Sequence, residues 1–454
     1  MKELPFHCAE PWQKLAITLP GLVPFCFSSP GGVAGRMDDD TPWSVAWNSP
    51  AMQQFRNDIR GIPPVQAHCK VCSHVSTNAV PHFVKDAEGF GSDTPYGENV
   101  RLQFQEYVAG AVHLESLPTI LHLEPSALCN LNCTMCSQTN VKQKAYESKK
   151  IDDVVRELLP VLTLLNWSGG EPLMQRSFNA FLDLFSDEVN PYCSVSIQSN
   201  GQLFGEKHYR MLRQARNAIV TLSIDGIGSV YEAIRRGGIW SRLDRIVSEL
   251  VRLRDAFPNI YISAAFTIQK NNVLNIPQFL EWCIAKRLPA QFMSVFNYPV
   301  NLRPDVFQRC GKETAGWRDA LDAALTLSKA LDVETSTMTN PLSGVASKAQ
   351  DYIDYYRKKI TASLDKGSSV FLRKIHVHGA NTQNAFVVIR DDHDVVTYGS
   401  VAADGFHVSL PAGRYTAAVY SSPYEEHLLA KDLVFTAEDG ADIALNTSED
   451  ITIF

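Results

Sequence analysis

Cys129, Cys133 and Cys136 lie close together in the segment CNLNCTMC, with three residues between the first two and two between the last two. Thiolate sulfur selects zinc or an iron–sulfur cluster over hard cations. A tetrahedral zinc ion and a four-iron cubane both have a fourth position, which this segment does not fill. Two alternatives follow: a zinc site completed by a histidine such as His113 or His122, or a cluster left open for a small molecule.

A second group of four cysteines lies nearer the N-terminus: Cys8, Cys26, Cys69 and Cys72. The first two flank an apolar, hairpin-like segment with Gly21 at its turn. The last two form a C-x2-C pair, whose loop can direct two thiolates at one metal. Four thiols complete a ligand set, so this group predicts a closed site that holds either zinc or an iron–sulfur cluster.

The central part of the chain alternates between short apolar runs rich in β-branched residues and amphipathic stretches. This alternation predicts βαβ units with a parallel sheet. Six units are too few for a closed eight-stranded barrel but fit a partial one, whose chemistry lies at the carboxyl ends of the strands. The predicted strands are 119–124, 162–168, 193–200, 218–225, 260–268 and 290–296, and the predicted helices 152–162, 176–185, 206–215, 241–257 and 276–287.

Three of these predicted strands end in groups that can bind a polar ligand. Glycine lets a ligand approach the backbone closely, a carboxylate accepts hydrogen bonds from an ammonium group, and serine or asparagine can meet ribose hydroxyls. The residues are Gly169, Gly170 and Glu171 in WSGGEP, Ser199 and Asn200 in QSNG, and Ser223 and Asp225 in SIDG.

These motifs together resemble the radical S-adenosylmethionine (radical SAM) superfamily over about residues 116–300. The resemblance implies a [4Fe–4S] cluster held by Cys129, Cys133 and Cys136, with S-adenosylmethionine bound at the fourth iron through its amino and carboxylate groups. It further implies reductive cleavage to a 5′-deoxyadenosyl radical that abstracts hydrogen from the substrate.

The same resemblance assigns roles to the residues at the strand ends. Arg235 is placed like an arginine that pairs with the methionine carboxylate, although its neighbour Arg236 is an alternative. Met135 stands where the family often has an aromatic residue, and its thioether can still pack on adenine. The remaining assignments are Gly169, Gly170 and Glu171 to the methionine ammonium, and Ser199, Asn200 and Ser223, with Asp225 in the same cavity, to ribose or carboxylate.

The N-terminal segment resembles the twitch module, the short form of the SPASM domain that carries an auxiliary cluster. This implies a second [4Fe–4S] cluster on Cys8, Cys26, Cys69 and Cys72, which transfers electrons because all its irons are ligated. The module follows the barrel in most relatives and precedes it here.

The length of the chain indicates how many domains to expect. A chain of 454 residues exceeds what a single core supports. The predicted fold class is therefore α/β, a partial (β/α)6 barrel with an N-terminal auxiliary-cluster module and a C-terminal antiparallel β-sandwich-like domain. The boundaries are 1–75 for the module, 76–115 for a connector, 116–310 for the barrel, 311–366 for a helical segment and 367–454 for the β-domain.

Charge and hydropathy restrict the partners and the location. The net charge of −7 gives no general attraction to nucleic acid. No apolar run reaches the roughly 18 residues that a membrane span needs. Ten cysteines, seven of them in two groups, suggest metal binding in a reducing compartment, so we expect a cytoplasmic protein.

The remaining three cysteines carry little chemistry. Cys193 and Cys283 lie in apolar patterns and are expected to be buried. Cys310 follows the last predicted strand and is a weak catalytic candidate, as a thiol that could return a hydrogen atom to a substrate radical.

The function predicted from these observations is radical chemistry of a redox type. The substrate would be a polar sugar-, cyclitol- or nucleotide-like molecule or a peptide, and the electron donor a flavodoxin or ferredoxin. Alternatives within the enzyme class are an epimerase and a maturase of ribosomal peptides. The alternative from another class is a zinc-stabilised binding or scaffold protein.

Overall fold

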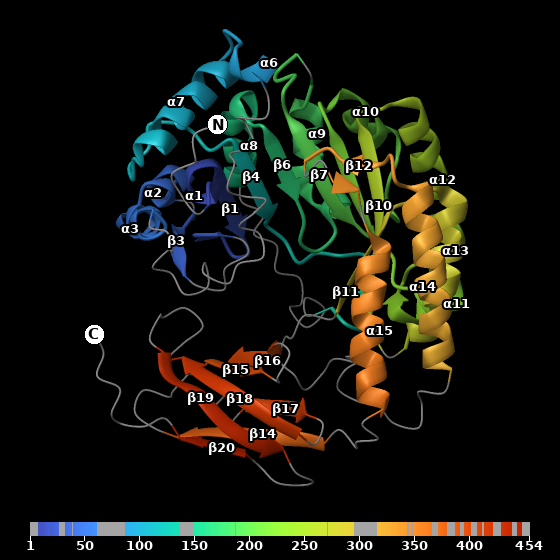
Figure 1. The fold of residues 1–454 in the computed structure, drawn as a ribbon. Coiled ribbons are helices and arrows are strands. Elements are labelled where there is room, and N and C mark those ends of the chain that lie inside the picture. Colours follow the sequence, from blue (N-terminus) through green and yellow to red (C-terminus); the bar gives the residue numbers. More distant parts are fainter. Residues whose placement is uncertain are drawn as a thin grey trace.

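The computed structural model describes residues 8–26, 32–38, 40–60, 87–136, 149–186, 188–269, 271–294, 316–342, 345–346 and 348–365, followed by the C-terminal strands given below. The architecture is α/β with a mostly parallel central sheet (Figure 1). Of the cysteines in the sequence, Cys69, Cys72 and Cys310 lie outside the described residues.

The central sheet has nine strands in the order β11-β10-β8-β7-β6-β4-β1-β2-β3. Six strands of this sheet, β4, β6, β7, β8, β10 and β11, are parallel and stand side by side in chain order, as expected for consecutive βαβ units. All six predicted strands of the barrel are present. The bounds are β1 (Lys14–Thr18), β2 (Leu22–Pro24), β3 (Val33–Arg36), β4 (Ile120–Glu124), β6 (Leu164–Trp167), β7 (Ser194–Ser199), β8 (Ala218–Ser223), β10 (Ile260–Ile268) and β11 (Ala290–Ser294).

The helices between these strands supply the apolar core on one face of the sheet. Side chains of α9, α12 and α13 belong to the same buried cluster as alternate residues of the strands. The helices are α8 (Lys149–Leu158), α9 (Arg176–Leu184), α10 (Glu206–Gln214), α11 (Ser229–Ile234), α12 (Trp240–Ala256) and α13 (Ile276–Lys286), with the 3-10 turns η3 (Leu159–Val161), η4 (Pro172–Met174) and η5 (Val273–Asn275).

Side chains of the parallel strands alternate between two chemically different faces. The face that meets the helices, called the outer face here, carries Leu123, Trp167, Ile197 and Val220 among other residues of the buried cluster. The opposite face, called the inner face, is largely polar where the strands approach their carboxyl ends. Its residues there are His122, Glu124, Asn166, Ser196, Gln198, Thr221 and Ser263. Strands buried in apolar cores on both faces would read as continuous apolar runs, and these do not.

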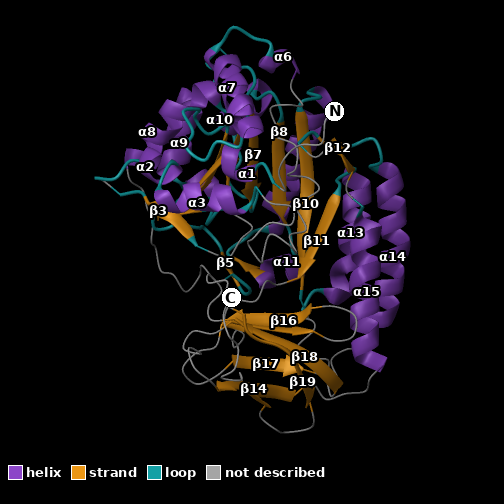
Figure 2. Cartoon of the chain, turned by 60° about the vertical axis from the view of Figure 1, so that its left-hand side comes forward, coloured by secondary structure: helices purple, strands orange, loops and turns teal. Residues whose placement is uncertain are grey.

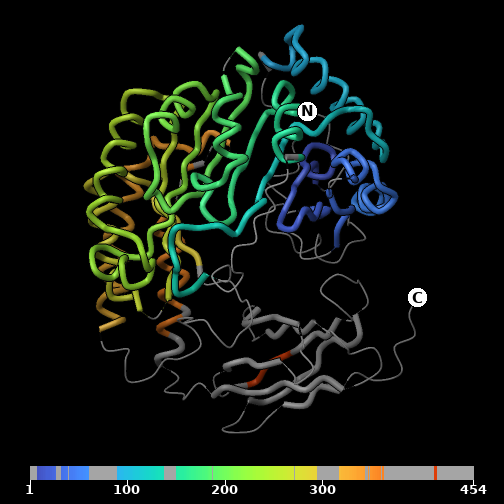
Figure 3. Tube along the Cα trace, turned by 180° about the vertical axis from the view of Figure 1, so that it is seen from behind, coloured from blue at the N-terminus to red at the C-terminus, as the bar shows by residue number. Residues whose placement is uncertain are grey.

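The N-terminal segment extends this sheet. Strand β1 pairs in parallel with β4, with Ala16 opposite His122, and forms the predicted hairpin with β2 through a turn at Gly21. Seen from behind, the blue N-terminal segment lies beside the chain that leads into β4 (Figure 3). The parallel β1–β4 pairing is not signalled by the local sequence, because the two strands are separated by about a hundred residues.

A buried arginine organises the N-terminal helices α1 (Glu10–Gln13), α2 (Trp43–Trp47) and α3 (Pro50–Asp58). The Arg56 guanidinium donates to the carbonyls of Pro11, Trp47 and Val112, and it lies over the Trp47 ring at 4.6 Å. Burial lowers the pKa of Arg56 to about 9. Helices α6 (Ala87–Phe90) and α7 (Pro95–Ala109) follow, and α7 begins at Thr94, which accepts a hydrogen bond from the Gly97 amide.

Two long helices and a group of strands complete the chain. Helices α14 (Trp317–Glu334) and α15 (Ala349–Asp365) pack beside α13 and β11 (Figure 2), and β12 (Thr339–Asn340) and β13 (Val345–Ala346) form a small hairpin between them. The C-terminal strands form two sheets, β17-β14-β20 and β16-β15-β18-β19. All their pairings are antiparallel except β14–β20, which is parallel and departs from the expected antiparallel pattern. Their bounds are β14 (Phe371–His378), β15 (Phe386–Arg390), β16 (Val395–Ser400), β17 (Phe406–Leu410), β18 (Gly413–Tyr420), β19 (Leu428–Ala437) and β20 (Ile443–Asn446).

Across the residues that the structure describes, no helix combines the length and the apolar character required to cross a bilayer.

Candidate active site

The three-cysteine loop follows β4 and is held by a short piece of antiparallel sheet. Strand β5 (Asn132–Cys133) pairs with β9 (Arg235–Arg236), with Cys133 opposite Arg235. The Thr134 amide also donates to the Ile234 carbonyl at 2.9 Å. The loop is therefore tied to the segment that follows β8 and α11, at the carboxyl ends of the parallel strands, as the sequence predicts.

The thiols of this loop are close enough to influence one another. The pKa of Cys133 is raised to about 11: burial is the main cause, Arg235 opposes it, and Asp225, Cys136 and Cys129 add to it. Burial also raises the pKa of Cys129. In the described part of the chain, no three Cys, His, Asp or Glu side chains already stand in the arrangement of a metal site. The donor set nevertheless fits a cluster, because three thiols on one loop are what iron–sulfur ligation requires and binding would deprotonate them.

The two glycines of WSGGEP let this loop pack against the chain that enters the cysteine loop. Gly169 and Gly170 both have positive φ, at 76° and 51°. A Cβ on Gly169 would lie 3.1 Å from Glu124 Cβ, and one on Gly170 would lie 2.8 Å from the carbonyl carbon of Ala127. Side chains cannot be accommodated there. The glycines thus serve a close loop-to-loop contact, in addition to any approach of a ligand.

Glu171 connects the second and third strand ends. Its carboxylate is fully buried and accepts from the Ser199 hydroxyl at 2.7 Å, from the Asn200 amide at 2.8 Å and from the Leu173 amide at 3.2 Å. Burial raises the pKa of Glu171, while these donors lower it. The Asn200 side chain then donates to Asn130 Oδ1 at 2.8 Å, within the cysteine loop. One hydrogen-bond network therefore joins GGEP and QSNG to the cysteines.

Arg235 connects the fourth strand end to the same loop. Its guanidinium forms an ion pair with Asp225 at 2.7 Å and lies 3.8 Å from the Cys133 sulfur. Both side chains of the pair are buried, whereas Arg236 is exposed. Burial alone would lower the pKa of Arg235, but Asp225 and Cys133 outweigh it and leave this pKa raised. A charged guanidinium therefore stands beside a thiol of the three-cysteine loop.

The other two predicted cofactor contacts lie at the same edge of the sheet. Ser223 ends β8, is half-buried and pairs with Ala265 of β10. Met135 is half-buried between Cys133 and Cys136. Their proposed contacts with S-adenosylmethionine stay predictions.

The remaining cysteines fall into two sets. Cys8 and Cys26 are half-buried and pack against the main core, and Cys8 Sγ accepts from the Glu10 amide at 3.4 Å. Their proposed partners Cys69 and Cys72 lie outside the described residues, so the auxiliary cluster stays a prediction. Cys193 and Cys283 are fully buried, which confirms the expectation for both.

A network on the inner face was not predicted as a site. The Ser168 hydroxyl donates to Glu124 Oε1 at 2.7 Å and lies 3.1 Å from His122 Nε2. His122 entered the prediction only as a zinc ligand. The signal available in the sequence was the alternation in ILHLE, which places His122 and Glu124 on the face opposite Leu121 and Leu123.

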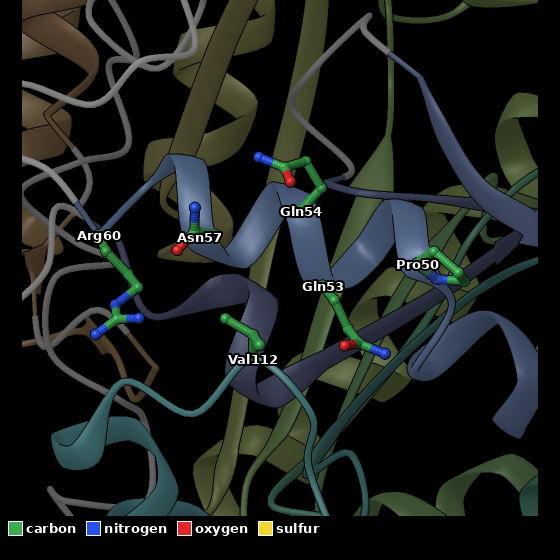
Figure 4. Close-up of a pocket in the computed structure, with 6 residues that line it drawn as sticks. All are labelled: Pro50, Gln53, Gln54, Asn57, Arg60 and Val112. Carbon is green, nitrogen blue, oxygen red and sulfur yellow. The ribbon is translucent and has the colours of Figure 1, made fainter.

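A separate cavity of about 400 Å³ lies on the surface of α3 (Figure 4). Its lining consists of Pro50, Gln53, Gln54, Asn57, Arg60 and Val112. The lining has no thiol, carboxylate or imidazole, so it offers no acid, base or metal ligand.

The segment that carries these motifs matches a known protein family. Residues 123–267 match the radical SAM superfamily. The matched segment begins in β4, ends in β10 and contains the three-cysteine loop, GGEP, QSNG and SIDG, and it covers less than half of the chain. At the level of the superfamily, the match supports the resemblance seen in the sequence.

Some solved structures are similar to part of the chain. Native anSMEcpe with bound AdoMet and Cp18Cys peptide is 19% identical over 50% of this chain and 61% of its own, with a TM-score of 0.35. Streptococcus suis SuiB bound to S-adenosylmethionine is 18% identical over 56% of this chain and 59% of its own, with a TM-score of 0.38. The chain thus spans less than two thirds of either structure. TM-scores this low do not establish a common fold, so the architecture stands on the strand register described above. No curated protein matches the sequence.

Proposed function

We propose that the chain is a radical SAM enzyme that oxidises a polar small molecule by a hydrogen-abstraction mechanism. Cys129, Cys133 and Cys136 would hold a [4Fe–4S] cluster whose fourth iron binds S-adenosylmethionine. When bound, these cofactors supply one-electron cleavage of the sulfonium and a carbon radical that takes a hydrogen atom from substrate. The observation that carries the proposal is the three-thiol loop at the carboxyl edge of the sheet, in a segment that matches the superfamily.

The protein's own contribution would be to position the cofactors and exclude water. The Glu171 network and the Asp225–Arg235 pair fix three strand ends relative to the cysteine loop. The Arg235 charge beside Cys133 favours the thiolate that a metal ligand must be. Groups held in this way need little rearrangement when a ligand arrives, which is the basis of preorganised catalysis.

The redox outcome of the proposal depends on a second electron carrier. Cys8, Cys26, Cys69 and Cys72 would hold an auxiliary [4Fe–4S] cluster that accepts the electron left on an oxidised substrate radical. A flavodoxin or ferredoxin would reduce the first cluster. The support for this part of the proposal is the residue type and the spacing of the four cysteines.

Anaerobic purification followed by metal analysis tests the cofactor assignment. The proposal predicts brown protein with about eight irons and eight sulfides per chain if both clusters form, about four if only the first does, and cleavage of S-adenosylmethionine to 5′-deoxyadenosine on reduction. Changing Cys129, Cys133 and Cys136 together to Ala should abolish this cleavage. Colourless protein that contains zinc would instead support a structural metal site.

The auxiliary cluster requires a separate test. Replacing Cys69 and Cys72 by Ala should halve the iron content and spare the cleavage of S-adenosylmethionine, yet slow substrate oxidation. Unchanged iron and unchanged turnover would remove the electron-transfer role.

A further inference from the structure

Two thiols of the three-cysteine loop each lie beside a side-chain nitrogen donor from another part of the chain. The Arg235 guanidinium nitrogen Nη1 lies 3.8 Å from Cys133 Sγ, and the Asn200 side-chain amide nitrogen lies 3.8 Å from Cys129 Sγ. The Leu131 backbone amide is a further donor to Cys129 Sγ, at 3.4 Å. Sulfur accepts such hydrogen bonds weakly as a thiol and more strongly as a thiolate.

The position of Arg235 is fixed from two sides. The β5–β9 pairing places Arg235 opposite Cys133, and the guanidinium Nη2 lies 2.7 Å from the Asp225 carboxylate. Asp225 is held in turn by the Thr267 amide, which donates to its Oδ1 at 2.7 Å. Both members of the ion pair are buried. The guanidinium is therefore kept beside one sulfur, whereas a solvated arginine would move among many rotamers.

Asn200 is held in a similar way, beside a different carboxylate. Its backbone amide donates to Glu171 Oε2 at 2.8 Å, and its side-chain nitrogen also donates to Asn130 Oδ1 at 2.8 Å. Its side-chain oxygen accepts from the Gln202 amide at 3.0 Å. This last contact sets the orientation of the carboxamide, because the oxygen is occupied by a donor and the nitrogen must therefore face Cys129.

A donor or a positive charge beside a cluster thiolate favours the reduced cluster. Reduction adds one negative charge, and both the hydrogen bonds to the sulfurs and the nearby charge help to set the reduction potential. The attraction between the Arg235 charge and an added electron is strong at a buried site, because water screens it little there. Asp225 carries the opposite charge and offsets part of this attraction, but the guanidinium is the member of the pair that contacts the sulfur.

We propose that Arg235 and Asn200 are positioning residues that raise the reduction potential of the proposed cluster by donating to two of its ligand thiolates, and that Asp225 limits the rise. This role rests on the proposed function, since it needs the [4Fe–4S] cluster, but it does not depend on bound S-adenosylmethionine. It is separate from the cofactor contacts that the sequence predicts for the two residues. A higher potential allows a weaker reductant to supply the electron, so these residues would define which electron donors can serve the enzyme.

Potentiometric titration of the anaerobically purified protein, followed by electron paramagnetic resonance of the reduced cluster, tests the proposal. The titration is made without S-adenosylmethionine, so that a contact with its carboxylate cannot contribute. Asp225→Asn keeps the Arg235 charge and removes its counter-charge, so the potential should rise. The double variant Asp225→Asn, Arg235→Gln removes both charges, and its reduction equilibrium constant should fall about tenfold below that of the unchanged protein, or about 59 mV for one electron.

The opposite signs distinguish this role from a merely structural one. A loosened cysteine loop would expose the cluster in both variants and move both potentials in the same direction. Two shifts of the same sign, or no shift in the double variant, would overturn the proposal. The double variant has no buried unpaired charge, so it remains a test of Arg235 even if Asp225→Asn does not fold.

Two further variants assign the effect to the individual donors. Arg236→Gln removes the same charge from the next residue, which is exposed, and should change the equilibrium constant less than about twofold because water screens it. Asn200→Ala removes a neutral donor and should lower the constant about threefold, since neutral hydrogen bonds have roughly half the strength of charge-assisted ones. An Arg236→Gln shift as large as that of the double variant contradicts the role of Arg235, and an unchanged potential in Asn200→Ala contradicts that of Asn200.

The failure of this proposal can be distinguished from the failure of the proposed function. A cluster that supports cleavage of S-adenosylmethionine, with a potential that these variants leave unchanged, would retain the radical mechanism and remove the role of the two donors. Potentials that shift as expected in a protein that cleaves no S-adenosylmethionine would do the reverse. Absence of any iron–sulfur signal would remove both.

Discussion

The outer and inner faces of one sheet differ in what they contribute. On β7, Ile197 points outward into the apolar core and is 1% exposed, whereas the next residue, Gln198, points inward and is exposed. On β4, β6 and β8 the inward residues near the strand ends, such as Glu124 and Thr221, are half-buried. Burial of the outer face stabilises the fold, because apolar area removed from water is its main driving force. The inner face is less completely buried near the carboxyl ends of the strands, where Gln198 is accessible to solvent.

Among the changes that compare the two faces of the sheet, the largest expected effect is loss of the proposed cluster. Cys133 lies in the three-cysteine loop at the carboxyl ends of the parallel strands, and Cys283 is fully buried in α13. Cys133→Ala should lose most of the iron of the first cluster, since a ligand is removed, whereas Cys283→Ala should keep it. Iron per chain measures both. Equal iron loss in the two variants would mean that the cysteine loop has no special role.

The next effect concerns the ion pair that ties the fourth strand end to the cysteine loop. Asp225→Asn leaves the buried Arg235 charge uncompensated and should cost about 3–5 kcal/mol of unfolding free energy. The exposed pair Asp153–Arg156 is the control, because its side chains are 60% and 61% exposed. Asp153→Asn should cost less than about 1 kcal/mol. Urea denaturation compares the two, and similar costs would contradict the buried, charged state of Arg235.

A direct comparison of the faces comes from neighbouring residues on β7. Ile197→Ala should cost about 2–5 kcal/mol, because it opens a cavity in the core. Gln198→Ala should cost less than about 0.5 kcal/mol, because it removes no buried contact. Urea denaturation measures both changes. A large cost at Gln198 would show that this part of the inner face belongs to a packed core.

The smallest expected effect is on the pH dependence of the unfolding free energy, through a histidine in a helix on the outer face. Burial lowers the pKa of His208 in α10 to about 4, from an ordinary value of 6.5. The unfolded chain therefore binds this proton first, and the stability associated with neutral His208 is lost as the pH falls from 6.5 toward 4. His208→Asn should make the decline shallower by up to about 1.4 kcal/mol per pH unit. An unchanged slope in urea titrations across this range would mean that His208 titrates normally.

The sequence predicts the parallel strands and their helices well, because strongly periodic segments report their own structure. It also predicts which strand ends meet, because parallel strands in chain order bring their carboxyl ends to one edge. Two features could be seen only in the folded structure. The β1–β4 pairing joins segments far apart in the chain, and the contacts of Ser168 with His122 and Glu124 join the ends of two strands.

The candidate site shows the same division. The type and spacing of three cysteines on one loop indicate metal binding from the sequence alone. The hydrogen bonds and the ion pair of Glu171 and Asp225, in contrast, are made with residues elsewhere in the chain. Glu171 was expected to face the ligand, and its three donors now occupy it. Such partners cannot be inferred from spacing, since they depend on the geometry of separate loops.

The central claim is that the three-cysteine loop leaves one iron open for S-adenosylmethionine. Electron paramagnetic resonance of the reduced protein, recorded with and without added S-adenosylmethionine, tests it most directly. The account predicts a cluster signal that changes on addition and saturates at one molecule per chain, with no such signal in the Cys129→Ala, Cys133→Ala, Cys136→Ala protein. A cluster signal that S-adenosylmethionine leaves unchanged would contradict it.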